Sequence, residues 1–417
     1  MAAIARGRRR DGLSRPRPGH LSCYGSQPLS RLDAVVVGGG VVGATCALAL
    51  SKAGLQVALV EARQPGHWRA DTPDLRVFAF APDNKALLED LGVWEPVAKA
   101  RACAYRRMRV WDAIGTTALE FDADSMATPQ LGWIIENGLL VDRLWQALDK
   151  AGVEVHCPER VASISQDDIG VRVRFESGRG LDCRIAIAAD GAQSTLRDLA
   201  GVNVAAEDYA QRGVVAYLSA DRPHEGTAYQ RFLAEGPLAL LPFEGRRISI
   251  VWTLPSARAE AMCTMAEDEF NAAVTRASDR CLGELTLVSE RASFPLRRQL
   301  VDSQLQGRVL VMGDAAHVVH PLAGQGVNLG LRDVTALLAS VRDAAARKQA
   351  FDSTTRLMRW ARRRKSDNVV SAMAFDTINK VYRRDDPLAG MVRASALAVA
   401  QRAGPLKRAL WRHAAGM

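Results

Sequence analysis

Two acidic residues of this sequence follow short apolar runs and stand where a ligand could be bound. Glu61 ends the run 56–60, and Asp314 comes soon after the run 309–312. Runs of this kind are typical of buried parallel strands, and open α/β sheets bind ligands at the carboxyl ends of such strands. A carboxylate at this edge can accept hydrogen bonds from the hydroxyl groups of a ligand. Both positions therefore indicate a binding site.

Glycines ahead of Glu61 indicate which ligand this is. Gly38, Gly40 and Gly43 have the spacing G-x-G-x-x-G. In that motif the glycines allow a tight turn, the approach of a pyrophosphate and close packing of helix on strand. Glu61 follows Gly40 at the distance at which an acidic residue binds an adenosine ribose. A glutamate here, instead of an arginine, favours an unphosphorylated ribose, as in FAD or NAD.

A second glycine-rich segment follows Asp314. Pro321, Gly324 and Gly326 predict a turn with few side chains, and residues 327–338 read as a helix. Such a turn brings backbone N–H groups close to a flat ligand, because no Cβ atoms intervene. The amino end of the helix adds unpaired donors and a partial positive charge, which suit an anionic group.

The elements that must hold these residues alternate between strand and helix. Residues 34–37 predict a strand, 41–52 a helix and 56–60 a second strand. Between 204 and 300 the apolar pattern is instead that of antiparallel strands. The strand–helix pattern resumes at Arg308. The sequence therefore predicts an α/β fold in which a Rossmann-type domain is interrupted by a mostly antiparallel β-sheet.

Composition excludes several other classes. The chain has 417 residues, of which 48% are hydrophobic and 24% charged, as in a globular protein. Seven cysteines without a C-x-x-C pair indicate reduced thiols in a reducing compartment. His317 and His320 lie three residues apart without further ligands nearby, so no metal site is expected. We expect no nucleic-acid partner.

Three motifs together resemble a known family. Residues 38–43 (GGGVVG), 188–197 (AADGAQSTLR) and 313–333 (GDAAHVVHPLAGQGVNLGLRD) are similar to the three FAD motifs of single-component aromatic-ring flavin monooxygenases. The segment HPLAGQGVNLGLRD resembles the UbiH/UbiF family of ubiquinone-biosynthesis hydroxylases. Local stretches such as Glu136–Asn137 and 402–408 look closest to the UbiF-like branch. The resemblance runs from about Asp33 to the C-terminus.

The resemblance implies a division into domains. Residues 33–100, 139–200 and 301–350 would form a discontinuous FAD-binding domain, and 101–138 and 201–300 the substrate domain. Residues 351–417 would be a C-terminal helical region. Residues 1–32 are rich in arginine and have no counterpart in the family. They are expected to be a disordered basic extension, a mitochondrial transit peptide or a product of a start codon set too early.

The resemblance also implies roles for individual residues. Gly38, Gly40 and Gly43 would approach the FAD pyrophosphate, and Glu61 would bind the adenosine ribose. The remaining cofactor contacts would be Arg76 near the phosphate and ribityl side, Arg143 as a further FAD contact, Asp190 in a motif associated with FAD and reduced nicotinamide, Asp314 on the ribityl chain, and Gly324, Gln325, Gly326, Val327 and Asn328 at the pyrimidine edge of the isoalloxazine. No catalytic side chain is assigned.

The reaction implied by the resemblance is aromatic hydroxylation with NAD(P)H and O2, through a flavin C4a-hydroperoxide. The favoured substrate is 2-polyprenyl-3-methyl-6-methoxy-1,4-benzoquinol. Alternatives are an FAD-dependent reductase acting on a prenyl chain and a non-catalytic flavin-binding scaffold. The peroxide needs shielding from water, for which six apolar residues are candidates: Trp133, Ile134, Leu240, Leu241, Phe243 and Trp252.

The C-terminal region concentrates the positive charge. Residues 356–412 contain fourteen Lys or Arg against four Asp, a net charge of +10, whereas the whole chain has +9. Residues 387–417 are too short and too charged to span a bilayer but suit a membrane interface. Packing on the FAD domain is the alternative. We expect a cytoplasmic protein, peripheral on the inner face of the membrane, or a matrix protein if residues 1–32 are a transit peptide. Association with other ubiquinone-biosynthesis proteins is also compatible with the family.

Overall fold

The computed structural model describes residues 31–113, 118–319 and 326–382, together with Arg408, Trp411, Arg412 and Ala415, and the side chains of the last helix as far as Asn368. The predicted basic extension of residues 1–32 lies almost entirely outside the described residues, as do Gly324, Gln325 and His320. Within the described part, strands and helices alternate as expected for the α/β class, which confirms the predicted fold class.

The first of three sheets is the predicted parallel one. β1 lies at its centre between β11 and β2, and β19 and β8 continue it in parallel on either side. In spatial order its strands are β18 (Leu305–Gln306), β19 (Val309–Val311), β11 (Gly180–Ala188), β1 (Leu32–Val37), β2 (Val57–Val60) and β8 (Glu154–His156), and the antiparallel strands β10 (Val171–Phe175) and β9 (Val161–Gln166) extend from β11.

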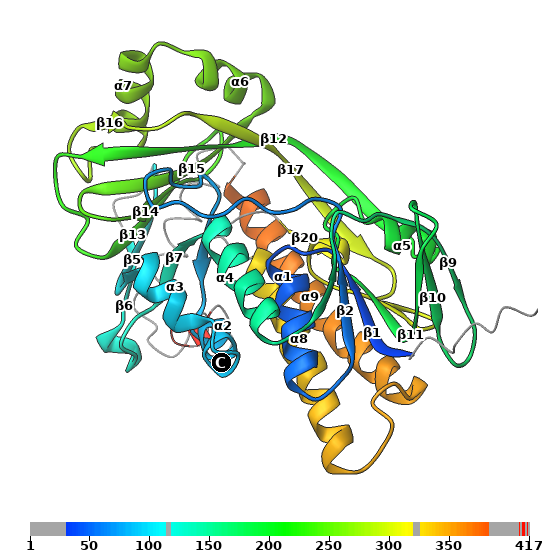
Figure 1. Cartoon of the computed structure of the whole chain (residues 1–417). Coiled ribbons are helices and arrows are strands. Elements are labelled where there is room, and N and C mark those ends of the chain that lie inside the picture. The colour runs from blue at the N-terminus through cyan, green and yellow to red at the C-terminus, as the bar shows by residue number, and fades with distance from the viewer. Residues whose placement is uncertain are drawn as a thin grey trace, which may run out of the picture.

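The two faces of this sheet have different covers, because successive side chains of a strand point to opposite faces. Val36 and Leu59 pack against helices on one face, and Val35 and Ala58 pack toward β9 and β10 on the other. Figure 1 shows α1, α4 and α8 side by side beside β1 and β2. The helices of this region are α1 (Val41–Lys52), α2 (Pro82–Asp90), α3 (Trp94–Arg101), α4 (Asn137–Lys150), α5 (Thr195–Leu199), α8 (Gly326–Ala346) and α9 (Thr354–Tyr382).

The second sheet is the predicted antiparallel interruption. In Figure 1 its long strands β12 and β17 run from the side of the molecule that carries α6 and α7 toward α5 and β10. In spatial order it contains β20 (His317–Val318), β17 (Ala292–Val301), β12 (Val204–Ala220), β15 (Arg247–Pro255), β14 (Leu238–Pro242), β13 (Thr227–Phe232), β5 (Arg107–Asp112) and β6 (Ala118–Asp122), and β16 (Leu285–Leu287) pairs with β12.

The two faces of this second sheet are covered differently. Helices α6 (Ser256–Thr264) and α7 (Glu267–Ala277) pack on one face, against Leu240 and Trp252 among others. The other face packs in part against a three-stranded sheet of β3 (Val77–Phe80), β7 (Gly132–Glu136) and β4 (Cys103–Tyr105). A short 3-10 helix, η1 (Asp124–Met126), follows β6.

One short strand joins the first and second sheets. β19 belongs to the first sheet, the 3-10 turn η2 (Gly313–Ala315) follows it, and β20 then pairs with β17 of the second sheet. The turn that carries Asp314 is therefore held between the two sheets.

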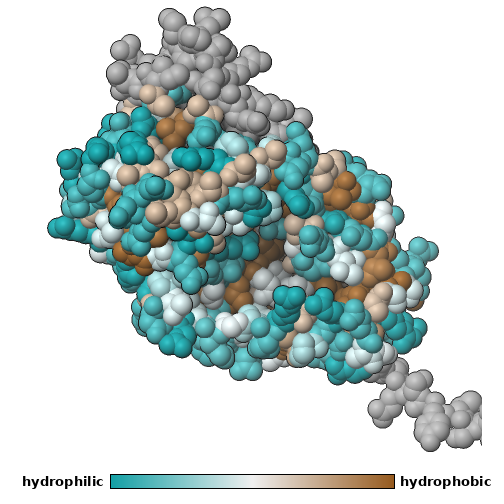
Figure 2. All heavy atoms as spheres, turned by 90° about the horizontal axis from the view of Figure 1, so that it is seen from above, coloured by the Kyte–Doolittle hydropathy of each residue, from teal (hydrophilic) through white to brown (hydrophobic). Residues whose placement is uncertain are grey.

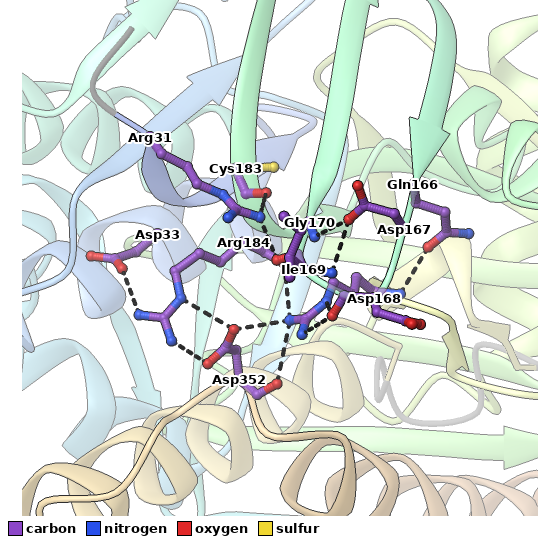
Figure 3. A network of polar contacts seen from close by, with 11 residues as sticks. Arg31, Asp33, Gln166, Asp167, Asp168, Ile169, Gly170, Cys183, Arg184 and Asp352 are labelled. Carbon is purple, nitrogen blue, oxygen red and sulfur yellow. Dashed lines mark hydrogen bonds and ion pairs between the residues drawn. The ribbon is translucent and has the colours of Figure 1, made fainter. Parts of the chain in front are cut away.

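A cluster of ion pairs and hydrogen bonds joins strands of the first sheet to the connection between α8 and α9 (Figure 3). Asp352, in the α8–α9 connection, accepts hydrogen bonds from Arg184 of β11, with Nε at 3.1 Å, and from Arg308 Nη1 at 2.9 Å. Arg184 also reaches Asp33 at 3.3 Å. Arg308 Nε donates to the carbonyl oxygen of Asp168 at 2.7 Å. These contacts join the starts of β1 and β19 to β11 and the helices.

Two features of the surface and the helices bear on possible ligands and membranes. In the part of the chain that the structure describes, no helix combines the length and apolar character needed to cross a bilayer. The face shown in Figure 2 is mostly hydrophilic, with a hollow near its middle whose wall carries hydrophobic residues.

Candidate active site

The first glycine turn has the shape that a pyrophosphate requires. A Cβ atom at Gly38, whose φ is +108°, would lie 2.3 Å from the carbonyl oxygen of Ala189, and one at Gly43 would lie 1.9 Å from the carbonyl oxygen of Gly38. These two glycines are therefore required by the packing of the backbone. A Cβ atom at Gly40 would meet no atom within 4 Å. Gly40 leaves the space open at the amino end of α1, where backbone donors bind anions.

Glu61 lies beside this turn with hydrogen-bonding capacity left over. Its Oε2 accepts from the backbone N–H of Gly39 at 2.5 Å, and its Oε1 accepts from that of Arg63 at 2.9 Å. Each carboxylate oxygen can accept a further hydrogen bond. A cavity of about 280 Å³ adjoins it, lined by Gly39, Gly40, Glu61, Arg63, Pro65, Gly66, Asn137, Gly138 and Val141. This arrangement fits the adenosine ribose of a dinucleotide.

Asp314 stands at a second, larger cavity. Its side chain is 42% exposed, and its Oδ2 lies 3.8 Å from Nη2 of Arg76. The guanidinium group of Arg76 also lies over the ring of Phe78, 5.3 Å from its centroid. Both charged residues line this cavity, as do Gly326 and Val327 at the start of α8. Six of the predicted cofactor positions thus line the two cavities. Gly40 and Glu61 line the smaller one, and Arg76, Asp314, Gly326 and Val327 line the larger one.

Beneath Asp314 lies a buried ionic cluster that sequence reasoning missed. Asp333 of α8 is fully buried and accepts hydrogen bonds from Gly313 N at 3.0 Å, His317 Nε2 at 2.7 Å and Arg364 Nε at 2.7 Å. Burial alone raises the pKa of Asp333, but His317 and Arg364 outweigh it and lower the pKa to about 2. The sequence did contain one signal for this cluster, namely a carboxylate among the apolar positions of the helix α8. His317, which the sequence did not connect with Asp333, is part of this cluster.

The side chain of Asn328 forms its hydrogen bonds inside the protein. It accepts from Ala81 N at 2.9 Å and Asn84 Nδ2 at 2.8 Å, and it donates to the carbonyl oxygen of Ala79 at 2.8 Å. These bonds join the first turn of α8 to β3 and α2. They leave the backbone of this turn as the part that can meet a ligand.

Arg143 and Asp190 have local partners. Arg143 forms an ion pair with the adjacent Asp142, and its guanidinium group lies over the ring of Trp68 at 5.6 Å. Asp190 accepts hydrogen bonds from the hydroxyl group of Ser194 and, at 3.1 Å, from the backbone N–H of Leu196. Burial raises the pKa of Asp190. Neither residue lines the two cavities, so their FAD contacts remain predictions.

A second buried network positions the segment that carries Arg76. Glu136 is fully buried, pairs with Arg101 at 3.0 Å and accepts the backbone N–H of Asp74 at 2.8 Å. Asp74 accepts the N–H of Gly138 at 2.9 Å, and the hydroxyl group of Tyr217 donates to its carbonyl oxygen at 2.8 Å. The β2–β3 connection is thereby held to β7 and β12. No periodic pattern in the sequence indicates this network.

The larger cavity has a volume of about 720 Å³ and a mostly apolar wall. Of the six predicted shielding residues, only Leu241 lines it. Leu240 and Trp252 point to the opposite face of the sheet, toward α6 and α7. Trp133, Ile134 and Phe243 pack in the core. Five of the six residues therefore do not line this cavity. For Leu240 and Trp252 the reason is that adjacent residues of a strand face opposite sides of the sheet.

The fit to FAD is good on these observations. An open glycine turn, a carboxylate beside a small cavity and a second carboxylate at a large cavity suit a pyrophosphate, a ribose and a ribityl chain in turn. Among the described residues there is no group of three or more His, Cys, Asp or Glu side chains that could hold a metal ion.

Known proteins share both the sequence and the fold. The family described as "FAD binding domain" matches residues 31–362. A 3-demethoxyubiquinol 3-hydroxylase of Escherichia coli is 34% identical, over 92% of this chain and 98% of the relative. The ubiquinone hydroxylase UbiL of Rhodospirillum rubrum is 31% identical, over 92% and 89%. The crystal structure of p-nitrophenol 4-monooxygenase PnpA from Pseudomonas putida matches with a TM-score of 0.74 at 21% identity, over 92% and 98% of the two chains.

These matches define first a class and then a family. The chain is an FAD-dependent enzyme of the monooxygenase class, with the FAD-binding fold over most of its length. Within that class it belongs to the ubiquinone-biosynthesis hydroxylases, the family that the segment HPLAGQGVNLGLRD resembles. The family predicted from the sequence is therefore confirmed.

Proposed function

We propose that this flavoenzyme hydroxylates the aromatic ring of a polyprenylated benzoquinol in ubiquinone biosynthesis, with NAD(P)H and O2 as co-substrates. The favoured substrate is 2-polyprenyl-3-methyl-6-methoxy-1,4-benzoquinol. Its ring lacks one substituent oxygen, and the name of the Escherichia coli relative describes hydroxylation of a demethoxyubiquinol. A ring of this kind is uncharged and electron-rich, which suits an apolar site beside a flavin.

The single observation that carries the proposal is the position of the larger cavity. It begins at Asp314, Gly326 and Val327, the predicted flavin positions, and continues along the apolar face of the second sheet. A largely apolar cavity with a few polar groups at one end is typical of a small-molecule site. The polar end binds the cofactor, and the apolar part accepts a hydrophobic substrate.

The residues of the chain would bind and orient the cofactor and the substrate, and they would exclude water. Bound FAD would supply electron transfer from NAD(P)H and the activation of O2. Glu61 and Asp314 would hold its ribose and ribityl hydroxyl groups, and the turn at Gly40 its pyrophosphate. Leu241 and its apolar neighbours keep water from the reacting ring, as such chemistry requires. Tyr105 is partly exposed at the cavity wall, and desolvation raises its pKa to about 12, so it lines the cavity as a neutral phenol.

Isotope labelling tests the proposal. The FAD-loaded protein is incubated with a short-tailed demethoxyquinol, NADH or NADPH and isotopically labelled O2. The molecular mass of the product is then measured by mass spectrometry. We expect one labelled oxygen atom per hydroxylated ring and no product without O2. Oxygen taken from labelled water would contradict the proposal. A prenyl-chain reductase would form product without O2, and a scaffold would show no flavin reduction by NAD(P)H.

We also propose that the protein lies at the membrane surface through residues 387–417. A polyprenyl quinol resides in the bilayer, and basic residues near an apolar segment attract anionic lipid. Trp411 and Ala415 are buried against Leu131 and Met126, whereas Arg408 and Arg412 are exposed. The lipid contact would therefore come from the basic residues of this segment.

Vesicle flotation tests the membrane contact. Neutralising Arg402, Lys407, Arg408 and Arg412 together should weaken binding to anionic vesicles, and added salt should do the same. Neutralising the exposed residues Lys99 and Lys150 of α3 and α4 is the control. Equal binding by all three proteins would refute the proposal.

A further inference from the structure

Neighbouring strands of the second sheet place a row of side chains opposite one another on its cavity face. Each residue is the register partner of the next, except for one step of two residues along β13. We name this set the sheet row: from β17 to β13 it contains Ala292, Val215, Val251, Ala239 and Gln230, and it continues through Ala228 and Met108 to Phe121 of β6. Every member lines the larger cavity.

The sheet row makes a long, narrow site. It crosses seven strands, and at the usual spacing of neighbouring strands this corresponds to about 29 Å along the sheet. Four of the first five side chains are Ala or Val, so they leave a groove under β3 and its neighbours. A single aromatic ring would fill only a small part of such a length.

The charged residues of the cavity gather at the cofactor end. Asp74, Arg76, Arg297 and Asp314 are the charged residues that line it in the described part of the chain. They belong to the β2–β3 connection, β17 and the turn after β19. Gln230 is the one polar member of the sheet row. The part of the cavity beyond β17 therefore suits an uncharged, apolar ligand.

The far end of the row is closed by the C-terminal segment. Trp411 and Ala415, spaced by four residues, line the cavity and pack with Leu131, Met126 and Phe121 in one cluster. Trp411 is 9% exposed and Ala415 is 3% exposed. A residue at position 411 thus meets a ligand whose other end lies near Asp314.

We propose that the sheet row binds the isoprenoid tail of the substrate, with the ring next to the cofactor end and the tail directed along β14, β13 and β5 toward Trp411. This inference rests on the function proposed above and adds the place and direction of the tail. It assigns the small side chains of the row a role in setting how much tail the enzyme accepts.

A block in the middle of the row tests the proposal. Ala239→Phe narrows the groove at β14, and tail beyond that point loses its contacts with β13, β5, β6 and Trp411. The measured quantity is kcat/KM for a long-tailed quinol divided by kcat/KM for the same ring with a single isoprene unit. We expect this ratio to fall by roughly tenfold or more, which corresponds to ~1.4 kcal/mol.

Two further variants keep the test decisive. Ala228→Leu blocks the adjacent strand β13 and should lower the same ratio, which covers a failure of Ala239→Phe to fold. Ala205→Phe introduces the same bulk at an exposed position of β12 outside the cavity and should leave the ratio unchanged. An unchanged ratio in both groove variants, or an equal loss with both substrates, overturns the proposal.

A ring-free ligand separates this inference from the proposed function. A long-chain polyprenyl alcohol, added to the FAD-loaded protein, should change the fluorescence of Trp411, and Trp411→Phe should abolish that change. Ala239→Phe should weaken its binding by roughly tenfold, or ~1.4 kcal/mol. Such binding without ring hydroxylation would support the tail site and refute the function, whereas hydroxylation without tail-dependent binding would do the reverse.

Discussion

Replacing Asp333 with asparagine would remove one negative charge from the interior of α8 with little change in volume. In the folded protein this carboxylate receives hydrogen bonds from Gly313, His317 and Arg364 at 2.7–3.0 Å. An asparagine oxygen can still accept from Gly313. The buried guanidinium group of Arg364 would lose its buried anionic partner and keep only the exposed Asp367. The variant therefore tests both the ionic cluster and the turn that it supports.

The expected loss in the free energy of unfolding follows from the burial of this ion pair. Breaking a buried ion pair by removing one partner costs about 3–5 kcal/mol. Because asparagine keeps one acceptor for Gly313, we expect a loss of about 3 kcal/mol in the free energy of unfolding at neutral pH. A typical folded protein has about 5–15 kcal/mol in total. FAD affinity should fall as well, because Gly313 adjoins Asp314.

The pH dependence has a definite sign. The pKa of Asp333 is lowered from 3.8 to about 2 by folding, so the folded state favours the ionised form. The resulting stabilisation is fully present above about pH 4 and is lost as pH falls toward about pH 2. The difference between wild type and Asp333→Asn should therefore be constant near neutrality and shrink below about pH 4.

Urea unfolding followed by tryptophan fluorescence, with and without FAD, measures these effects. Asp343→Asn is the matched control on the same helix, because the side chain of Asp343 is 43% exposed and pairs with Arg347 and Arg356. Its effect should be much smaller, since exposed ion pairs are screened by water and salt. Equal stability of Asp333→Asn and wild type, or a difference that does not change below pH 4, would refute this reasoning.

Four other substitutions address the cofactor site and the second buried network. Gly40→Val should abolish FAD binding but leave the FAD-free protein folded, whereas Gly43→Val should unfold it, because only the second Cβ meets backbone atoms; circular dichroism and flavin fluorescence separate the two. Asp314→Ala should weaken FAD binding by about 1.5–3 kcal/mol, the value of a hydrogen bond to a charged group, and an unchanged Kd would contradict its assignment. Arg101→Met should lower the free energy of unfolding by about 3–5 kcal/mol, because it leaves Glu136 as an unpaired buried charge; a loss below 1 kcal/mol would argue against this.

Local spacing was enough to determine the nucleotide turn and the elements around it. Gly38, Gly40, Gly43 and Glu61 lie within one strand–helix–strand unit, so their relative positions follow from residues near in sequence. The helix predicted at 41–52 has those bounds in the structure. The order of parallel and antiparallel regions followed in the same way from apolar periodicity, which is also a local property.

Only the tertiary structure decided which residues support and line the site. Asp333 meets Arg364, and Arg101 meets Glu136, across stretches of about thirty residues that no periodic pattern connects. The cavity likewise joins residues from Asp74 to Ala415.

The strands of the second sheet show the physical reason most clearly. Alternation along β14 and β15 predicts that Ala239 and Val251 face one side and Leu240 and Trp252 the other. It does not tell which side receives the helices α6 and α7, and hydrophobicity alone favours the larger residues as cavity walls. Because α6 and α7 pack on Leu240 and Trp252, the small residues Ala239 and Val251 face the cavity. The choice of face depends on contacts between distant segments, and those form only when the chain folds.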